Sequence, residues 1–513
     1  MNQTDILLCT LNSTYQHAAF GLRYLLANMD SLKPRTAILE WTIKENPRVI
    51  VEKILLCQPQ IVGFGVYIWN TTETLQVIAT LKKVAPQIII VLGGSEISHE
   101  TETQEHLKWC DFVLKGEADL SFPLFCKNYF ELGLKPETQI VTSALPDIKA
   151  LQTPYDLYTD DDIKNRIIYV EASRGCPYKC EYCLSSLDKS VRSFDLPQFL
   201  ASIKMLMDRG ARTFKFVDRT FNLSPTTSCQ ILKFFLEHIE LGLFLHFEMV
   251  PDRLPPEIKE LIQQFPNGSL QFEVGIQTLN PVVAANVSRK NDLVKVEQNF
   301  NYLRTSTKVH THADLIVGLP GETLDSFAAG FDRLALMGPD EIQVGILKRL
   351  KGTPIARHEK TFQMIYSNFP PFQILSTTTM DYITLQKMNR FAKFWDLYAN
   401  SGNFKSFMAW FKDANSKESF FWSFFSFSEF LSERFTETHS LSLISLAEQA
   451  WLYLKSKNVS ETEASRLIEA DFCFGMTRRD LPHFLKPLTH ANQNTTFAEL
   501  NKKNKRQLQH LFN

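Results

Sequence analysis

Three cysteines lie within one short segment of the chain, Ser173-Arg-Gly-Cys-Pro-Tyr-Lys-Cys-Glu-Tyr-Cys183. Cys176, Cys180 and Cys183 have the spacing C-x3-C-x2-C. A β-rich run at 167–172 precedes them, so we expect the thiols on a loop that leaves a strand. A glycine and a proline beside the first cysteine favour a tight turn, which lets three short side chains converge on one soft metal centre.

The number of cysteines indicates which metal centre they fit. A closed structural zinc site needs four ligands, and no Cys or His between Cys183 and Cys229 completes a tetrahedron. A 4Fe-4S cluster held by three thiolates instead leaves one iron open for a substrate or cofactor. An adventitious zinc site and three unconnected thiols are the alternatives.

This motif resembles the signature of the radical S-adenosylmethionine (radical SAM) superfamily, in which an aromatic residue precedes the last cysteine, here Tyr182. The resemblance implies that SAM chelates the open iron of a 4Fe-4S cluster. Electron transfer would then break a carbon-sulfur bond and give a 5′-deoxyadenosyl radical. The resemblance also implies that Tyr182 brings its backbone near the adenine.

Strand-like and helical runs alternate in the first part of the chain, which predicts a doubly wound parallel sheet. The expected strands are 5–10, 37–39, 61–66, 88–92 and 112–114. Ligands of such sheets bind beyond the carboxyl ends of the strands. Gly93, Gly94 and Ser95 follow the fourth run, and Gly116 and Glu117 follow the fifth. The glycines either let a ligand approach the backbone or form ordinary tight turns.

A Rossmann-like domain directly before a radical SAM motif resembles the cobalamin-binding class of that superfamily. The resemblance covers residues 1–140 and implies that Gly93, Gly94 and Ser95 contact cobalamin, with its dimethylbenzimidazole tail in the sheet crevice. The D-x-H-x-x-G motif of methionine-synthase-like domains is absent from the sequence. We therefore expect cobalamin without a histidine ligand, and His17 at a loop or pocket edge.

Residues 141–165 are expected to link two domains, and they contain the acidic cluster Asp160-Asp161-Asp162. We interpret these acids as a solvated turn or a helix start, with a metal site as the alternative. Residues 166–358 then repeat strands and helices six times, which suggests a partial (β/α)6 barrel with its chemistry at the carboxyl ends of the strands. The expected strands are 167–172, 213–217, 244–249, 270–276, 310–317 and 341–347.

Polar residues near those strand ends resemble SAM-binding segments of the superfamily. Asp218 falls in the segment that holds the SAM amino group, Glu273 in the one near the ribose and carboxylate, and Gly318 in the turn beside adenine. Arg289 falls where a related arginine often occurs, although the match is loose. A hydrogen bond inside the barrel is the alternative for each.

Residues 359–513 are expected to form a helical domain, which resembles the C-terminal extension of some cobalamin-binding radical SAM proteins. The segment 420–427 is unusually aromatic, which indicates either a helix buried against the barrel or an apolar substrate wall. Lys502-Lys-Asn-Lys-Arg506 is either a solvated tail or a contact for a phosphate-rich partner.

Composition limits the class of protein. The 513 residues are 44% hydrophobic and 22% charged with a net charge of -1, which is typical of soluble globular proteins and does not favour a nucleic-acid or membrane partner. We expect no signal peptide, and no apolar run approaches the roughly 20 residues of a membrane span. Nine scattered cysteines fit a reducing cytoplasm, which is the expected location.

The sequence therefore predicts an α/β protein with a doubly wound Rossmann-like domain, a partial (β/α)6 barrel and a helical C-terminal domain. We expect an enzyme with a 4Fe-4S cluster, SAM and cobalamin that methylates an unactivated carbon. Its partners would be a small-molecule or peptide substrate and an external electron donor.

One alternative is radical chemistry without methyl transfer, such as a rearrangement or a tRNA methylthiolation that uses further cysteines (Cys9, Cys57, Cys110, Cys126). Another is a non-enzymatic metal-binding protein.

Overall fold

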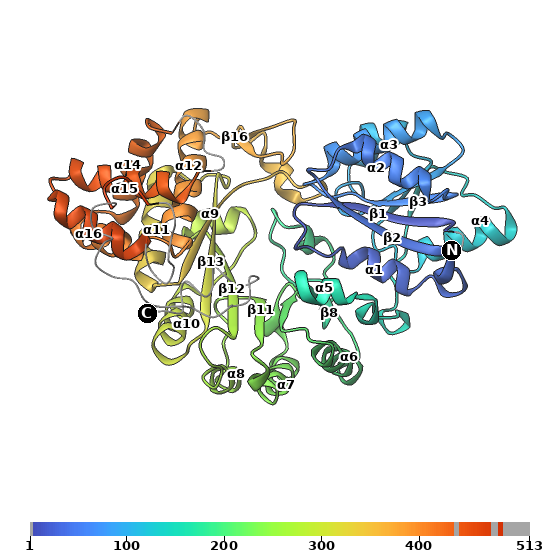
Figure 1. The fold of residues 1–513 in the computed structure, drawn as a ribbon, viewed down its shortest axis with the longest axis horizontal. Helices are drawn as coiled ribbons and strands as arrows, with labels where there is room; N and C mark the ends of the chain where they lie inside the picture. Colours follow the sequence, from blue (N-terminus) through green and yellow to red (C-terminus); the bar gives the residue numbers. More distant parts are fainter. Residues whose placement is uncertain (1–3, 436–440, 473–480, 486–513) are drawn as a thin grey trace.

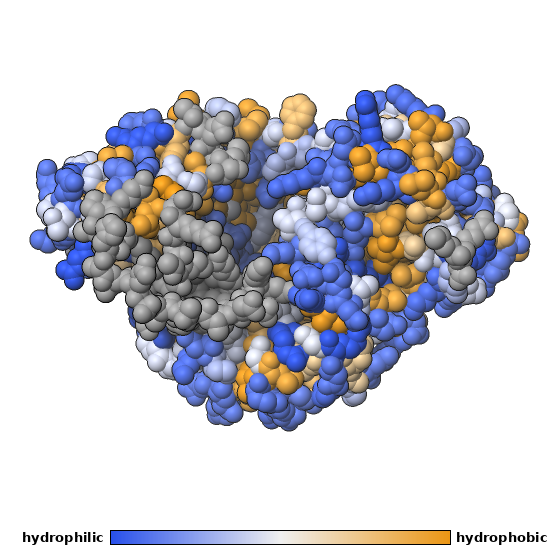
Figure 2. Space-filling view, in the orientation of Figure 1, coloured by the Kyte–Doolittle hydropathy of each residue, from blue (hydrophilic) through white to orange (hydrophobic). Residues whose placement is uncertain are grey.

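The protein folds into two lobes. The computed structural model describes residues 4–435, 441–472 and 481–485. Figure 1 shows the N-terminal sheet with its helices as one lobe, and the second sheet with the C-terminal helices as the other. In Figure 2 the surface is mostly hydrophilic and is hollowed where the lobes meet.

The first sheet has six parallel strands in the order β2-β1-β3-β4-β5-β6. They are β1 (Ile6–Asn12), β2 (Thr36–Thr42), β3 (Ile61–Gly65), β4 (Ile89–Gly93), β5 (Phe112–Lys115) and β6 (Ile140–Thr142). The central strands β1 and β3 are buried along their whole length, as continuous apolar runs predict. The strand order reverses between β1 and β3, where ligands of doubly wound sheets bind.

Helices cover both faces of this sheet. They are α1 (Phe20–Ala27), α2 (Pro47–Leu56), α3 (Thr71–Val84) and α4 (Ser121–Leu132). Ile50 of α2 and Val77 of α3 belong to one core, and Leu22 of α1 and Phe122 of α4 belong to the other. The predicted doubly wound architecture is confirmed.

Two details of the connection between the lobes differ from the sequence interpretation. Strand β6 was not expected, and it adds a sixth strand at the sheet edge. Helix α5 (Asp160–Asn165) begins with a capping box between Thr159 and Asp162, so the predicted helix start is confirmed. The acids are not all solvated, however, because Asp162 is buried and accepts a 2.8 Å hydrogen bond from Arg23.

The second sheet also has six parallel strands, in the order β14-β13-β12-β11-β10-β7. They are β7 (Ile168–Val170), β10 (Thr213–Phe216), β11 (Phe244–Met249), β12 (Leu270–Gln277), β13 (His310–Val317) and β14 (Glu341–Ile346). All six lie within the predicted runs or within one residue of them. Strands β7 and β14 are the two edges, so the barrel is open.

Outer helices bury one face of this sheet. They are α6 (Leu196–Asp208), α7 (Pro225–Leu236), α8 (Pro256–Ile262), α9 (Pro281–Asn286), α10 (Leu293–Ser306) and α11 (Leu324–Met337). Alternation along β10 turns Phe214 and Phe216 into the core, while Lys215 between them reaches Glu273 of β12 at 3.6 Å. The opposite, inner face of the sheet is therefore polar.

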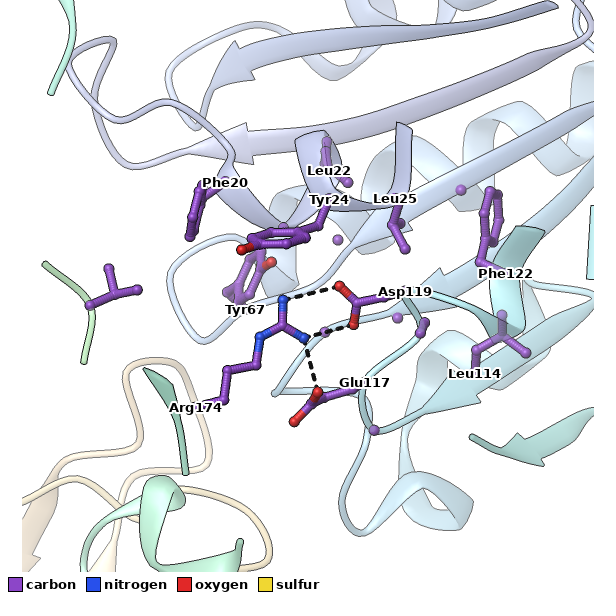
Figure 3. A pocket seen from close by; sticks show the side chains of 18 of the residues that line it. Phe20, Leu22, Tyr24, Leu25, Tyr67, Leu114, Glu117, Asp119, Phe122 and Arg174 are labelled. Atoms are coloured by element: carbon purple, nitrogen blue, oxygen red, sulfur yellow. Dashed lines mark hydrogen bonds and ion pairs between the residues drawn. The ribbon is translucent and has the colours of Figure 1, made fainter. Parts of the chain in front are cut away.

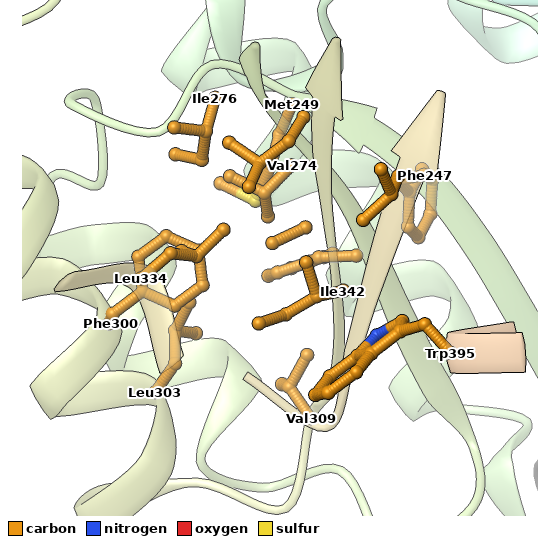
Figure 4. Packing of buried hydrophobic residues seen from close by; sticks show 14 of the residues in the cluster. Phe247, Met249, Val274, Ile276, Phe300, Leu303, Val309, Leu334, Ile342 and Trp395 are labelled. Carbon is orange, nitrogen blue, oxygen red and sulfur yellow. The ribbon is translucent and has the colours of Figure 1, made fainter. Parts of the chain in front are cut away.

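The C-terminal helices extend the core of the barrel. They are α12 (Tyr382–Trp395), α13 (Lys405–Ala414), α14 (Phe420–Ser432), α15 (Leu443–Ser456) and α16 (Glu461–Phe472). Two short antiparallel pairs complete the fold: β8 (Ser173–Arg174) with β9 (Arg192–Ser193), and β15 (Ile365–Tyr366) with β16 (Ile374–Ser376). Figure 4 shows Trp395 of α12 packed beside Ile342 of β14.

The aromatic helix α14 is a core element. Phe421, Phe424 and Phe427 are fully buried. Phe421 packs against Phe331 of α11, with ring centroids 5.7 Å apart. Of the two interpretations of this segment, the buried helix is therefore confirmed. The basic cluster at 502–506 lies outside the described residues, and no helix among those described is long and apolar enough to cross a membrane.

Candidate active site

The three cysteines line one cavity of about 270 Å³ at the carboxyl ends of the barrel strands, which we call the cysteine cavity. Cys176 and Cys180 are buried and Cys183 is partly exposed. Within the described parts of the chain, no three His, Cys, Asp or Glu side chains surround a single point closely enough to hold one ion. A cubane does not require such a point, because each thiolate binds a different iron. The donor set and its shared cavity therefore fit a 4Fe-4S cluster.

The cysteine loop is held between the short strands β8 and β9. Gly175 has a φ of +91°, and a Cβ there would lie 2.0 Å from the carbonyl oxygen of Ser190 on the opposite side of the loop. The amide of Cys176 donates to the carbonyl of Asp188 at 3.0 Å. Only glycine fits this close approach, which explains the residue before the first cysteine.

A buried glutamate anchors the loop from its other side. Glu181 stands between Cys180 and Tyr182, and it accepts hydrogen bonds from Ser288 at 2.5 Å and from His358 at 2.9 Å. Its own carbonyl accepts from Ile355 at 3.0 Å. The loop is thereby tied to the segment that leads into the C-terminal helices.

Arg289 contacts the cysteine loop directly. Its Nη1 lies 3.5 Å from Cys180 Sγ and 3.2 Å from the hydroxyl of Tyr182, and its Nη2 donates to the carbonyl of Gly275. Arg289 matched the superfamily's arginine only loosely in sequence, yet the structure places its guanidinium beside a cysteine sulfur. A donor in this position stabilises a thiolate and its cluster.

Carboxylates on the inner face of the barrel line the same cavity. Burial raises the pKa of Glu248 to about 7, and it also raises the pKa of Asp314. Although burial opposes it, the hydrogen bond from His246 and the charge of Lys215 hold the pKa of Glu273 below its usual value. Burial lowers the pKa of His246, and the ammonium of Lys215 lies 3.6 Å from Glu273.

The end of β12 carries backbone strain beside these carboxylates. Gln277 lines the cysteine cavity with a φ of +69°, and the strand register shifts between Gly275 and Gln277. Such conformations gather at binding sites, where surrounding contacts hold them. Gly275 leaves room for the side chains of Gln277 and Arg289, which a Cβ would meet at 2.7 and 3.4 Å.

Two predicted cofactor residues lie elsewhere. Asp218 accepts hydrogen bonds from the amide of Ala172 at 2.9 Å and from Ser173 Oγ at 2.7 Å, so it braces the strand that leads into the cysteine loop. Gly318, with a φ of +88°, packs against Ile374 rather than lining the cysteine cavity. Tyr182 and Glu273 do line it. The roles of all four as SAM contacts stay predictions.

A second cavity, of about 490 Å³, lies at the carboxyl ends of the first sheet, and we call it the glycine cavity. Gly63, Gly65, Gly93 and Gly94 line it, together with apolar side chains. Figure 3 shows Leu22, Leu25, Leu114 and Phe122 along one side of this space. A glycine edge beside an apolar slot fits a flat aromatic group such as the dimethylbenzimidazole of cobalamin.

Only glycine fits at position 94, because the turn that lines this cavity passes close to the backbone of Val66. The φ of Gly94 is +103°, and a Cβ would lie 2.5 Å from the carbonyl oxygen of Val66. Gly93 has no such restriction, because its Cβ would meet its nearest atom at 3.7 Å. Ser95, the third predicted residue of this turn, is partly buried and is not among the lining residues.

A charged network joins the two lobes beside the glycine cavity. In Figure 3 Arg174 points into the cavity below Tyr24 and reaches Glu117 and Asp119 of the first domain. Its Nη1 lies 2.9 Å from Glu117 and 3.0 Å from Asp119, and Arg192 also pairs with Glu117. Sequence reasoning missed this role of Arg174, although the residue stands two positions before Cys176.

His17 lies at the interface of the lobes and outside the glycine cavity. Its Nδ1 is 2.5 Å from the hydroxyl of Tyr169 on β7, and it forms an isolated bridge with Ile167. This placement agrees with the interpretation of His17 as a loop residue.

The two cavities adjoin each other. Ser185, just after the last cysteine, and Arg219, just after β10, line both of them. Arg219 in turn lies 3.6 Å from Glu248, on the floor of the cysteine cavity. A group bound in one cavity can therefore lie next to a group bound in the other.

Three family models match the chain. They are the B12 binding domain over residues 6–125, the Radical SAM superfamily over 170–334, and a family described as protein of unknown function (DUF4080) over 360–513. The first two coincide with the two parallel sheets. The chain thus contains a B12-binding domain and a radical SAM domain, which confirms the predicted class, the fold class, the expectation of an enzyme, and SAM and cobalamin as cofactors.

Two relatives with known activities share little sequence with this chain. The tRNA-2-methylthio-N(6)-dimethylallyladenosine synthase of Acinetobacter baylyi is 21% identical over 295 residues, which is 55% of this chain and 60% of that protein. The cobalamin-dependent radical SAM methyltransferase TokK of Streptomyces tokunonensis is 21% identical over 60% of this chain and 50% of its own length. The chain thus matches only about half to three-fifths of these relatives.

Among solved structures, the cobalamin-dependent SAM radical enzyme OxsB with aqua-cobalamin and SAM bound superposes with a TM-score of 0.60. The sequences are 12% identical, and the match covers 90% of this chain and 78% of OxsB. At this identity the likeness concerns the fold alone.

Proposed function

We propose that this protein is a cobalamin-dependent radical SAM methyltransferase that methylates an unactivated carbon. The observation that carries the proposal is the shared wall of the two cavities, where Ser185 and Arg219 line both. A methyl donor held in the glycine cavity and a radical source held in the cysteine cavity could then act on one substrate atom.

The chemistry requires both cofactors. An unactivated carbon-hydrogen bond is too weakly acidic for a side-chain base to remove its proton. When bound, the cluster with SAM supplies a primary carbon radical that takes the hydrogen atom, and methylcobalamin supplies the methyl group. The protein has to bind the cofactors, orient them and keep water away from the radical.

In the cysteine cavity, Cys176, Cys180 and Cys183 would bind three irons and leave the fourth for SAM. Arg289 would stabilise the cluster through its contact with Cys180 Sγ. The carboxylates of Glu273 and Asp314 face the same space and would accept hydrogen bonds from the ammonium and ribose hydroxyls of SAM. Asp314 Oδ1 is buried and lies 3.3 Å from His312 Nε2, so the barrel already holds this carboxylate in place.

In the glycine cavity, Gly93 and Gly94 would let cobalamin approach the backbone, and Phe122 would pack against its aromatic tail. Arg174 is held at the mouth of this cavity by Glu117 and Asp119. It would therefore position the cofactor relative to the cysteine loop, to which it belongs.

The likeness to a tRNA methylthiotransferase favours a second candidate, tRNA methylthiolation. That version requires three further cysteines at one place for a second cluster. Cys9 and Cys110 are buried in the apolar core on one face of the first sheet, with Cys57 packed against that core, and Cys126 is buried in the core on the other face; none of the four lines the cysteine cavity or the glycine cavity. Burial also raises the pKa of Cys110 to about 12, which disfavours its thiolate. We therefore prefer methyl transfer to a small-molecule or peptide substrate over a nucleic-acid substrate, with an external electron donor.

Anaerobic reconstitution with iron, sulfide and hydroxocobalamin tests the proposal. After reduction with SAM, we expect both 5′-deoxyadenosine and S-adenosylhomocysteine. Formation of 5′-deoxyadenosine alone would contradict methyl transfer, and the absence of both products from a sample with a full cluster would contradict the function as a whole. Four irons beyond the first four, bound with labile sulfide, would favour the methylthiolation candidate.

A further inference from the structure

A third cavity, of about 510 Å³, lies at the free edge of strand β14, and we call it the edge cavity. One side is β14 with its continuation to Lys348, and the other is helix α12 with the π-helical turn η10 (Asp396–Asn400). Tyr182 lines both this cavity and the cysteine cavity. The edge cavity therefore adjoins the candidate active site. It lies at the β14 edge of the barrel sheet, and the first domain contacts the opposite edge, at β7.

The backbone of β14 is only partly covered along this edge. Asn400 caps its first outward residue: the Asn400 side chain accepts from the amide of Ile342 at 3.1 Å and donates to its carbonyl at 2.9 Å. Every second residue of an edge strand turns the same way. Val344 and Ile346 therefore also turn their amides and carbonyls toward the cavity, and within the described residues nothing hydrogen-bonds to these groups.

The covered ends define the length of this open edge. Asn400 closes it at Ile342, and the segment around Gln373 closes it at Lys348 through an isolated antiparallel bridge. Val344 and Ile346 thus remain unpaired on this side among the described residues, and their two amides and two carbonyls follow each other along the same edge of the strand. An extended peptide segment presents the complementary pattern, and pairing of this kind is how peptides add to sheet edges.

Charged and polar side chains line part of the edge cavity. Lys348 and Lys393 both line it, and neither pairs with a carboxylate in the part of the chain that the structure describes. Asp396 contributes one negative charge, so the lysines leave a positive excess. Gln343 connects the cavity to the inner face of the barrel, because its side chain lies 3.1 Å from His312, which in turn is 3.3 Å from Asp314.

We infer that the edge cavity binds the substrate, and that the substrate is an extended peptide segment with a carboxylate near the paired residues. Val344 and Ile346 would pair with its backbone, and Lys348 and Lys393 would bind the carboxylate. This inference rests on the proposed function, because it assigns the substrate class of the same site. The carboxylate can belong to an acidic side chain or to the peptide's own C-terminus.

Three peptides of matched length test the inference on the full-length, cluster-loaded protein. They are acetyl-tetra-alanine, its C-terminal amide, and an amide in which the last alanine is replaced by aspartate. Saturation-transfer NMR measures the dissociation constant of each. We expect the two carboxylate peptides to bind at least about tenfold more tightly than the neutral one, as a charged hydrogen bond implies. The tighter of the two identifies the source of the carboxylate.

Two sets of variants separate the contributions. Lys348→Ala with Lys393→Ala should weaken the carboxylate peptides about tenfold and leave the neutral peptide unchanged. Val344→Pro removes one outward amide and keeps the bonds to β13, as edge strands tolerate, and should weaken all three peptides about fivefold. Lys53→Ala, an exposed lysine on α2 in the other lobe, is the matched control. An N-methylated peptide tests the same backbone pairing if Val344→Pro does not fold.

Equal binding of charged and neutral peptides to wild type and variants would overturn the inference. So would a concentration-dependent dimer that Val344→Pro abolishes, because a second copy of the chain would then occupy the edge. In every sample the cluster iron content and 5′-deoxyadenosine formation are measured alongside. Loss of peptide binding with normal SAM cleavage contradicts only the substrate assignment, whereas loss of SAM cleavage in wild type contradicts the proposed function.

Discussion

Arg174 Nη1 lies 2.9 Å from Glu117 Oε2, and this ion pair crosses from the cysteine loop to the first domain. Glu117 follows β5 at the edge of the glycine cavity, while Arg174 precedes Cys176 by two residues. Arg192 also pairs with Glu117 and lies 3.0 Å from Asp188, whose carbonyl accepts from the amide of Cys176. The geometry of the cysteine loop therefore depends on the position of the domain that would bind cobalamin.

This network predicts that cluster and cobalamin assist each other's binding. Coupling between two sites is reciprocal and typically worth about 5- to 150-fold in affinity. In wild type we expect hydroxocobalamin to bind about fivefold or more tightly when the cluster is present. Glu117→Gln removes the carboxylate charge that Arg174 and Arg192 share. In this variant the ratio of cobalamin affinities with and without the cluster should fall close to one.

Absorbance titration of hydroxocobalamin, before and after the iron is removed with a chelator, measures this ratio. Glu100→Gln is the matched control, because Glu100 also crosses between the lobes, to Arg349 at 3.0 Å, but does not line the glycine cavity. A wild-type ratio of one, or an equal loss in both variants, would contradict the coupling.

The turn after β4 gives a second prediction, based on two adjacent glycines. Gly94→Ala forces a Cβ onto the carbonyl of Val66 at a positive φ, so it should lower the free energy of unfolding by at least about 2 kcal/mol. Gly93→Ala has room and should change it by less than about 1 kcal/mol. Urea unfolding of the cofactor-free proteins measures both, and equal losses would show that the turn is not restricted as described.

The regular parts of this fold could be predicted from the sequence because they are buried. Strands such as β3 and β13 carry apolar or alternating runs, and these patterns indicate a strand. Strand β6 was missed because it is only three residues long, two half-buried and one exposed, at a sheet edge where packing imposes little pattern. The domain boundaries at 140, 165 and 358 stay predictions.

The candidate site was predictable only where chemistry follows from local spacing. The three cysteines satisfy that condition. Arg174 and Glu117 are 57 residues apart, and no local pattern pairs them. Asp218 illustrates a different limit: its place after β10 was expected, but strand position alone does not tell whether a carboxylate faces the cavity or, as here, the amide of Ala172.

The cysteines give a third prediction. Cys176→Ala, Cys180→Ala and Cys183→Ala should each abolish assembly of a 4Fe-4S cluster, because two thiolates hold too few irons. Cys229→Ala is the control, since Cys229 lies on α7 outside the cysteine cavity and should keep its full iron content. Iron and sulfide analysis after anaerobic reconstitution measures the effect, and a cysteine variant with full iron content would refute that residue's role.

Arg289 gives a fourth prediction, which concerns the electronic properties of the cluster. A cation hydrogen-bonded to a cysteine sulfur favours the reduced, more negative state. Arg289→Met should therefore shift the reduction potential of the cluster to more negative values by an amount on the order of tens of millivolts. Redox titration followed by electron paramagnetic resonance measures the shift. Arg333→Met, which removes a half-exposed arginine paired with Glu297, should leave the potential unchanged, and an equal shift in both would contradict the assignment.

The last prediction concerns pH and a carboxylate outside both cofactor cavities. Burial raises the pKa of Glu322 to about 7, although hydrogen bonds from Thr278 at 2.9 Å and Ser326 oppose the rise. The folded state therefore binds a proton that the unfolded state releases near pH 4.5, so stability falls as pH rises from about 4.5 to 7. Glu322→Gln mimics the protonated form at every pH. We expect the variant to be more stable than wild type by less than about 1 kcal/mol near pH 5 and by about 2 kcal/mol or more at pH 8. Urea unfolding at both pH values measures the difference, and a gap that is the same at pH 5 and pH 8 would show that Glu322 is charged throughout this range.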